Sequence, residues 1–176
     1  MKLIKPSQEY FEAYYEACKE SYVNNVTEWM PFDPKDYEHW KSNILQIYGN
    51  YETGQSIPEQ MPRIYTYWCI EEEQLVGEIQ LRPFLTESQA KEWGHVSYAV
   101  RYSKWHQGYG TKLLKMSLEI AKAFELKNIY IACRTDNTGS IRIIEKNMGI
   151  LVHEFTEEDG TKNNLYLISI EGRENT

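Results

Sequence analysis

The sequence predicts a mixed α/β fold, in which a mostly antiparallel sheet of about six to seven strands is flanked by helices. Three observations predict it. Amphipathic helical patterns fill the first third of the chain, and strand pairs joined by short turns occur in the middle and at the end. One strand–helix–strand unit lies between those pairs. We expect the helices to cover the sheet and the apolar strand residues to form the core.

Composition supports a single domain over residues 1–176. Hydrophobic residues make up 41% of the chain and charged residues 26%, which suffices for a sizeable core. The net charge of −7 argues against nucleic-acid binding, which favours a basic face. No apolar run reaches the length of a membrane span, and the first residues lack the apolar core of a secretory signal. We therefore expect a soluble, cytoplasmic protein that binds neither membrane nor nucleic acid.

The cysteines indicate neither a disulfide framework nor a metal site. Cys18, Cys69 and Cys133 are far apart, show no CxxC spacing, and each has apolar neighbours. We expect three buried free thiols and no bound metal.

Helical spacing predicts two helices in the first third. Residues 1–4 are expected to form a short strand, after which Ser7 begins a helix with the apolar positions Phe11, Tyr14, Cys18 and Tyr22. The second helix is expected to have Asp33 as its N-cap, Pro34 in its first position and Gly49 just past its end. Its apolar face would consist of Tyr37, Trp40, Ile44 and Ile47, and residues 50–62 would form a loop. The aromatic residues of this half, including Trp29, are expected mainly in the core, with an acceptor-pocket wall as the alternative.

The rest of the chain reads mainly as strands. A hairpin turn at 72–74 and a turn at Gly160 separate strand pairs, and Gly149 is expected to end a short helix. The predicted strands are 63–71, 75–84, 94–102 and 128–134, followed by two strands within 150–170; the predicted helices are 108–126 and 137–149.

The segment "WHQGYGTKLL", residues 105–114, combines two glycines with the start of the predicted helix. No Asp or Glu occurs between Trp93 and Leu118, although acids are the majority charge elsewhere. The first N–H groups of a helix have no internal partner, and the helix dipole favours an anion there. Gly108 and Gly110 would let the main chain approach a phosphate, with Gln107 and Thr111 as further donors. The alternative is that the glycines only shape the turn.

Two motifs together resemble the GNAT superfamily of N-acetyltransferases, which bind acetyl-coenzyme A. The first, Gln/Arg-x-x-Gly-x-Gly/Ala, corresponds to Trp105–Gly110. The second corresponds to Asn137, Ser140, Ile144, Glu145, Lys146, Gly149 and Ile150. The resemblance covers about residues 63–170 and implies the GNAT-like fold, acetyl-CoA as cosubstrate, and acetyl transfer to an amine. Acid-free surroundings would then spare the cofactor's phosphates from repulsion.

The resemblance also implies residue roles. The pyrophosphate would lie on the loop amides of Gln107, Gly108, Tyr109, Gly110 and Thr111. The pantetheine arm would pair with backbone groups of Tyr98, Val100 and Arg101. Asn137 would bond that arm, with Ser140 nearby, and the Val100 amide would polarise the thioester carbonyl.

The two motifs do not identify the catalytic groups. Trp105 stands where the family has Gln or Arg, and Ile144 where a tyrosine often protonates the departing thiolate. Glu92, Tyr98 and Ser140 are the candidate catalytic residues, with structural roles as their alternative. Glu78 and His95 are expected to be structural. A non-catalytic coenzyme A sensor and an unrelated phosphate-binding domain remain alternatives. The small-molecule or peptide acceptor, and whether the protein forms a homodimer, are open.

Overall fold

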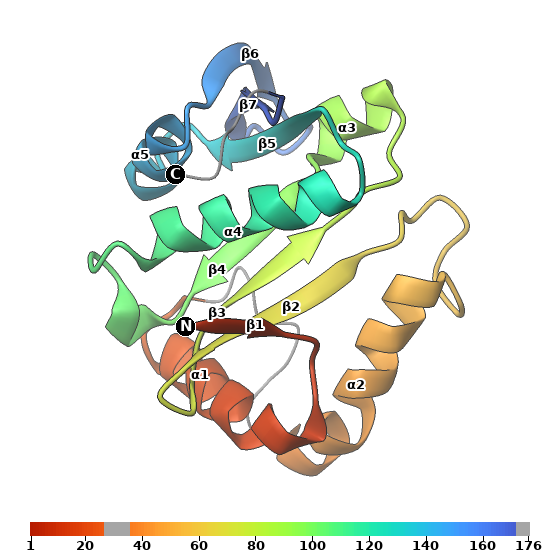
Figure 1. Ribbon diagram of the computed structural model, residues 1–176, viewed down its shortest axis with the longest axis vertical. Helices are drawn as coiled ribbons and strands as arrows, with labels where there is room; N and C mark the ends of the chain where they lie inside the picture. Colours follow the sequence, from red (N-terminus) through yellow and green to blue (C-terminus); the bar gives the residue numbers. More distant parts are fainter. Residues whose placement is uncertain (27–35, 172–176) are drawn as a thin grey trace. The chain divides into compact units, whose positions relative to one another are not determined.

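A computed structural model describes residues 1–26 and 36–171, and its element order matches the predicted α/β class (Figure 1). In this described part the strands form two sheets, with orders β1-β2-β3-β4 and β5-β7-β6, so the predicted fold class is confirmed. The predicted cap residues Asp33 and Pro34, and Trp29, lie outside the described residues. The strands are β1 (Lys2–Ile4), β2 (Tyr65–Glu71), β3 (Gln74–Leu81), β4 (Val96–Val100), β5 (Asn128–Arg134), β6 (Ile150–Thr156) and β7 (Lys162–Ser169). The helices are α1 (Phe11–Val23), α2 (Tyr37–Thr53), α3 (Glu87–Trp93), α4 (Tyr109–Ala123) and α5 (Thr138–Lys146).

The chain divides into two compact units. The first consists of Met1–Gln80 and Tyr98–Tyr109, and the second of Leu81–Ser97 and the chain from Gly110 onward. No helix among the described residues is both long enough and apolar enough to cross a membrane.

In the first unit, α1 and α2 lie on the same side of β1, β2 and β3 (Figure 1). The Tyr14 ring stacks on Trp68 of β2, with centroids 4.6 Å apart, and both side chains are fully buried. Phe11 and Cys18 are also buried, as their helical spacing predicts. Tyr22 was expected on the same face but is 44% exposed, because the buried face of α1 continues through Ser21 instead.

Helix α2 is longer than predicted. It passes through Gly49 and continues to Thr53, so the expected loop from residue 50 is wrong in its first four positions. The helix ends where Gly54 takes a left-handed conformation, φ 77°, and donates its N–H to the Asn50 carbonyl. Gly54, and not Gly49, is therefore the terminating glycine.

The hairpin between β2 and β3 forms where predicted. Glu72 and Glu73 both have positive φ, 49° and 61°, as a two-residue turn matching the strand twist requires. β4 is shorter than its predicted range because a helix precedes it. That helix, α3, has Thr86 as its N-cap. The Thr86 hydroxyl accepts from the Gln89 N–H, and the Gln89 side chain accepts from the Thr86 N–H.

The second unit contains the three-stranded sheet. β7 lies in the middle and pairs antiparallel with β5 and β6, with a register shift in β6 between Leu151 and His153. Helix α4 buries Leu113, Leu114 and Leu118, as its predicted apolar face requires.

Candidate functional site

The loop between β4 and α4 has a backbone conformation suited to an anion. After a 3-10 turn at Tyr102–Lys104, His106 and Gly108 both adopt positive φ, 58° and 82°, and α4 begins at Tyr109. Positive φ at these two positions bends the chain sharply just before the helix, and the first amides of a helix have no internal partner, so they are available to an anion. A Cβ on Gly108 would meet nothing within 4 Å, so glycine is needed there for its φ and not for space.

The second glycine of the pair has a different environment. Gly110 lies inside the first turn of α4 and is buried, whereas Gly108 is exposed. Close approach of a ligand to the main chain is therefore available at Gly108, and Gly110 contributes to the packing of the helix start.

Side chains fix the loop in place. The Trp105 indole Nε1 donates to the Val100 carbonyl at 2.8 Å, and its ring lies 4.9 Å from that of Tyr102. The Gln107 side chain donates to the Ser103 carbonyl at 2.8 Å, so this side chain is engaged within the loop. Trp105, which departs from the family motif, thus ties the loop to the end of β4.

Acids approach the loop in space although none is near in sequence. Glu20 of α1 accepts from the Arg101 guanidinium at 2.7 Å and from the Ser103 N–H, and Glu71 of β2 accepts from the Tyr109 hydroxyl. Burial alone would raise the pKa of Glu20, but its bonds from Arg101 and Ser103 bring the pKa below its ordinary value. The expectation of acid-free surroundings is therefore wrong, because folding brings in carboxylates from distant segments.

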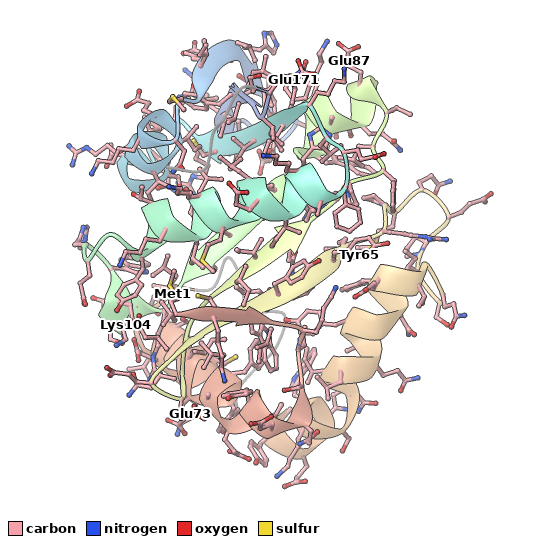
Figure 2. All side chains as sticks on the ribbon, in the orientation of Figure 1. Met1, Tyr65, Glu73, Glu87, Lys104 and Glu171 are labelled. Atoms are coloured by element: carbon pink, nitrogen blue, oxygen red, sulfur yellow. The ribbon has the colours of Figure 1, made fainter. Side chains whose placement is uncertain are left out.

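These carboxylates change the local charge balance. Arg101 is neutralised by Glu20. The Lys104 ammonium, on the loop in Figure 2, lies 6.0 Å from the Tyr109 ring centroid and forms no ion pair with a carboxylate of the described residues. The amides and Lys104 are thus the groups of this unit that can attract an anion to the loop.

Backbone pairing leaves one edge of β4 for a ligand. The Arg101 N–H donates to the Val76 carbonyl on β3 at 2.8 Å, so it is used inside the sheet. By strand alternation the backbone groups of Val100 and Tyr98 point to the opposite edge, and β4 is the last strand of its sheet. Trp105 occupies the Val100 carbonyl on that side. The predicted contacts of Tyr98 and Val100 are compatible with this geometry, whereas the amide of Arg101 is not available.

In the second unit, the other motif forms the ends of α5. Asn137 is exposed and is the N-cap, its Oδ1 accepting from the Ser140 N–H at 3.0 Å, so its Nδ2 remains as the donor to a ligand. Asn147 at the other end donates to the Thr111 carbonyl at 3.3 Å, which joins α5 to the first turn of α4. Ile144 is fully buried and offers no hydroxyl. Sequence reasoning did not assign a role to Asn147, Glu20 or Glu71.

The candidate catalytic residues lie on separate elements. Tyr98 is half-buried on β4 in the first unit, and Ser140 is half-buried on α5 in the second. Glu92 is exposed on α3, so the strand alternation used to place it beside Tyr98 does not apply to it.

The two residues expected to be structural are buried. His95 Nδ1 accepts from the Tyr130 N–H at 3.0 Å, and burial lowers its pKa. Glu78 accepts hydrogen bonds from Tyr48, Trp68 and Gln80, and burial raises its pKa to about 7. Both carry internal hydrogen bonds that account for their burial.

The fold is that of an α/β protein in which a glycine-containing loop leads directly into a helix start. The family model for the acetyltransferase (GNAT) domain matches residues 1–148, and the chain belongs to this family. The resemblance seen in the motifs is thereby confirmed.

Solved structures share the fold at low identity. A ribosomal-protein-S5-alanine acetyltransferase from Vibrio fischeri has a TM-score of 0.71 and 13% identity, covering 98% of this chain and 94% of the other. A spermidine N-acetyltransferase chimera from Vibrio cholerae and hSSAT has 0.66 and 11%, covering 96% and 95%. The microcin C7 self-immunity acetyltransferase MccE, in complex with acetyl-CoA and AMP, has 0.66 and 14%, covering 95% and 91%. A search of curated protein sequences gives no significant match.

Proposed function

We propose that this protein is an N-acetyltransferase that transfers the acetyl group of acetyl-CoA to a primary amine. The observation that carries the proposal is a sharply bent loop, with positive φ at His106 and Gly108, directly before the start of α4 in a chain of the GNAT family. The diphosphate of coenzyme A would accept from the amides of Gln107–Thr111, with Lys104 as a nearby cation.

The pantetheine arm would lie along the open edge of β4. There it would pair with the backbone of Tyr98 and the Val100 N–H. The Val100 N–H would also be the donor that stabilises negative charge on the thioester oxygen during attack.

Acetyl transfer would proceed by direct attack within a ternary complex. The neutral amine forms the new C–N bond to the acetyl carbon, the C–S bond breaks, the electron pair leaves on the thiolate, and the amine loses one proton. A free thiol has a pKa of about 8.5, so the thiolate is a tolerable leaving group even though position 144 carries isoleucine and not a tyrosine that could protonate it. Tyr98, which lies on the same strand as the Val100 N–H, is the proposed proton-handling group of the first unit. Ser140 and Glu92 stay predictions from the sequence, and Glu92 has lost its strand-alternation argument because it lies on α3.

The similar structures support an amine as the acceptor. By their names, one acts on an alanine of ribosomal protein S5 and another on spermidine, which are both amine substrates. A ribosomal protein and spermidine differ greatly in size, so a panel of amines is needed to identify the acceptor of this protein.

One observation favours a second function, a coenzyme A sensor without catalysis. Ile144 is fully buried, so the position that often carries the acidic tyrosine is part of the core. A thiol-release assay over an amine panel separates the two. Turnover with any amine supports the transferase, and tight cofactor binding without turnover across a broad panel supports the sensor.

Titration calorimetry with coenzyme A tests the loop. Gly108→Val should weaken binding by about tenfold or more, because a β-branched residue resists positive φ and the amide concavity is lost. Gly160→Val is the matched control, since Gly160 has φ 88°, equally open surroundings and a position in the β6–β7 turn. Equal affinities of the two folded variants would contradict the loop assignment.

A further inference from the structure

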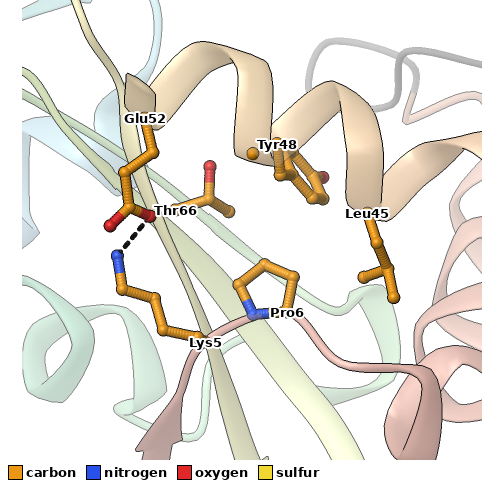
Figure 3. A pocket seen from close by; sticks show the side chains of 7 residues that line it. Lys5, Pro6, Leu45, Tyr48, Glu52 and Thr66 are labelled. Atoms are coloured by element: carbon orange, nitrogen blue, oxygen red, sulfur yellow. Dashed lines mark hydrogen bonds and ion pairs between the residues drawn. The ribbon is translucent and has the colours of Figure 1, made fainter. Parts of the chain in front are cut away.

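A pocket in the first unit lies apart from the β4–α4 loop. Its volume is about 160 Å³, and its walls come from the segment before α1, the second half of α2 and the start of β2 (Figure 3). The lining residues are Lys5, Pro6, Leu45, Tyr48, Gly49, Glu52 and Thr66.

One opposite-charge pair stands at this pocket. Lys5 Nζ lies 2.7 Å from Glu52 Oε2, and both side chains are partly exposed. The same ammonium lies 4.3 Å from the Tyr67 ring centroid and 5.0 Å from that of Tyr65, which holds Lys5 in place when its carboxylate partner changes.

A buried hydroxyl faces the same space. Thr66 is only 2% exposed, and its Oγ1 has no hydrogen-bond partner among the described residues. In Figure 3 this oxygen points toward α2, between Glu52 and Tyr48. A buried polar atom without a partner is costly, and a ligand that supplies one recovers that cost.

The remaining walls are apolar or open. Pro6, Leu45 and the ring of Tyr48 form the apolar side. Gly49 lies inside α2, and a Cβ built on it would meet nothing within 4 Å. A glycine inside a helix is unfavourable for helix formation. Here the missing side chain of Gly49 leaves space in the pocket.

From these features we propose that the pocket binds a small zwitterionic α-amino acid. Its carboxylate pairs with Lys5, its ammonium pairs with Glu52 and donates to Thr66 Oγ1, and a small aliphatic side chain lies against Pro6 and Leu45. A ligand with only a positive charge would take Glu52 from Lys5 and leave the Lys5 ammonium unpaired. A ligand with only a negative charge would likewise leave the Glu52 carboxylate unpaired. A zwitterion satisfies both charges, and a pocket of about 160 Å³ suits a small side chain such as that of alanine or valine.

Titration calorimetry of the full chain with L-valine and L-alanine tests this proposal without acetyl-CoA, so the outcome does not depend on acetyl transfer. Saturable millimolar binding is expected. N-acetyl-L-valine, which lacks the cation, and L-valinamide, which lacks the carboxylate, should bind at least about tenfold more weakly. The absence of saturable heat with both amino acids, or binding of either half-charged analogue as tight as that of L-valine, would overturn it.

Variants locate the ligand. Gly49→Leu fills the pocket and improves helix propensity, so it should remain folded and lose binding. Glu52→Gln should weaken binding by about tenfold, whereas Glu16→Gln, which breaks the exposed Lys19–Glu16 pair on α1, should not change it. Valine binding of Gly49→Leu at wild-type strength would place the ligand elsewhere and refute the assignment.

Discussion

Glu78 is a buried carboxylate whose hydrogen-bond partners are all neutral. Its Oε2 accepts from the Tyr48 hydroxyl at 2.7 Å and from the Trp68 indole at 3.0 Å, and its Oε1 accepts from Gln80 at 3.0 Å. The Tyr14 hydroxyl lies a further 3.1 Å from that of Tyr48. Burial therefore dominates and raises the pKa of Glu78 to about 7, against the smaller opposing effect of the hydrogen bonds.

This raised pKa predicts a stability change with pH. In the unfolded chain Glu78 ionises near its ordinary pKa of 4.5, and in the folded protein it keeps its proton until about pH 7. Between these values the folded state binds more protons, so the free energy of unfolding falls as pH rises. The full effect is up to about 3 kcal/mol at about 1.4 kcal/mol per unit.

Glu78→Gln should remove this component. The amide oxygen can accept from Tyr48 and Trp68, and a flipped Gln80 can accept from the amide nitrogen, so the cluster stays bonded. Urea unfolding at a series of pH values measures the difference between variant and wild type, in which the other groups cancel. The variant should gain stability relative to wild type between pH 4.5 and about 7 and show a constant difference above. A constant difference across the whole range would contradict a raised pKa.

At the scale of elements, local patterns predicted the elements well and their ends less well. The hairpin at residues 72–74 and strand β5 were predicted from sequence because turn chemistry and apolar runs are local signals. The end of α2 was placed at Gly49 although Gly54 ends it, because one glycine costs a helix only about 1 kcal/mol and Tyr51, in the turn beyond Gly49, packs against the core. Helix α3 was missed although its Thr86–Gln89 capping box was visible, because the helix is short and has little apolar periodicity.

The candidate site shows the same division. The glycine loop and the helix from residue 137 are contiguous motifs, so the sequence predicted both, although the capping role of Asn137 was not foreseen. Glu20 and Glu71 reach the loop from α1 and β2, and no pattern near residues 105–111 reports such distant partners. Likewise, the bond from Asn147 to Thr111 depends on how α5 packs against α4.

The position just after α5 has no room for a side chain, so it requires Gly149. A Cβ there would lie 2.3 Å from Ile144 Cγ2 and 3.0 Å from the Ile144 carbonyl oxygen, and Ile144 is fully buried. Gly149→Ala should therefore lower the free energy of unfolding by about 1–3 kcal/mol, the usual cost of overpacking.

Gly139→Ala on the same helix is the control. Its Cβ would make only an ordinary contact, at 3.5 Å from Asn137 Oδ1, so the change should be neutral or stabilising by up to about 1 kcal/mol. Urea denaturation measures both variants. A Gly149→Ala protein as stable as Gly139→Ala would show that α5 and its following turn shift freely.

The state of the three cysteines determines whether the protein could carry the acetyl group on a thiol. Cys18 and Cys69 are buried and Cys133 is half-buried, and all three thiols are free. Burial raises the pKa of Cys69 to about 12, that of Cys133 to about 11, and that of Cys18 well above its ordinary value. The thiolate is the nucleophile in acyl transfer, so none of these groups is suited to carry the acetyl group at neutral pH.

If the proposed transferase activity holds, transfer should therefore be sequential. Initial rates at varied acetyl-CoA and amine should give intersecting double-reciprocal lines, because both substrates must be bound before the C–S bond breaks. Parallel lines would instead indicate the ping-pong kinetics of a covalent acetyl-protein. Intact-mass measurement after incubation with acetyl-CoA alone should show no acetylated cysteine, and Cys133→Ser should keep the wild-type rate within about twofold, as expected for a thiol outside the chemistry. An acetylated cysteine that passes its acetyl group to added amine would overturn direct attack while leaving the cofactor loop assignment intact.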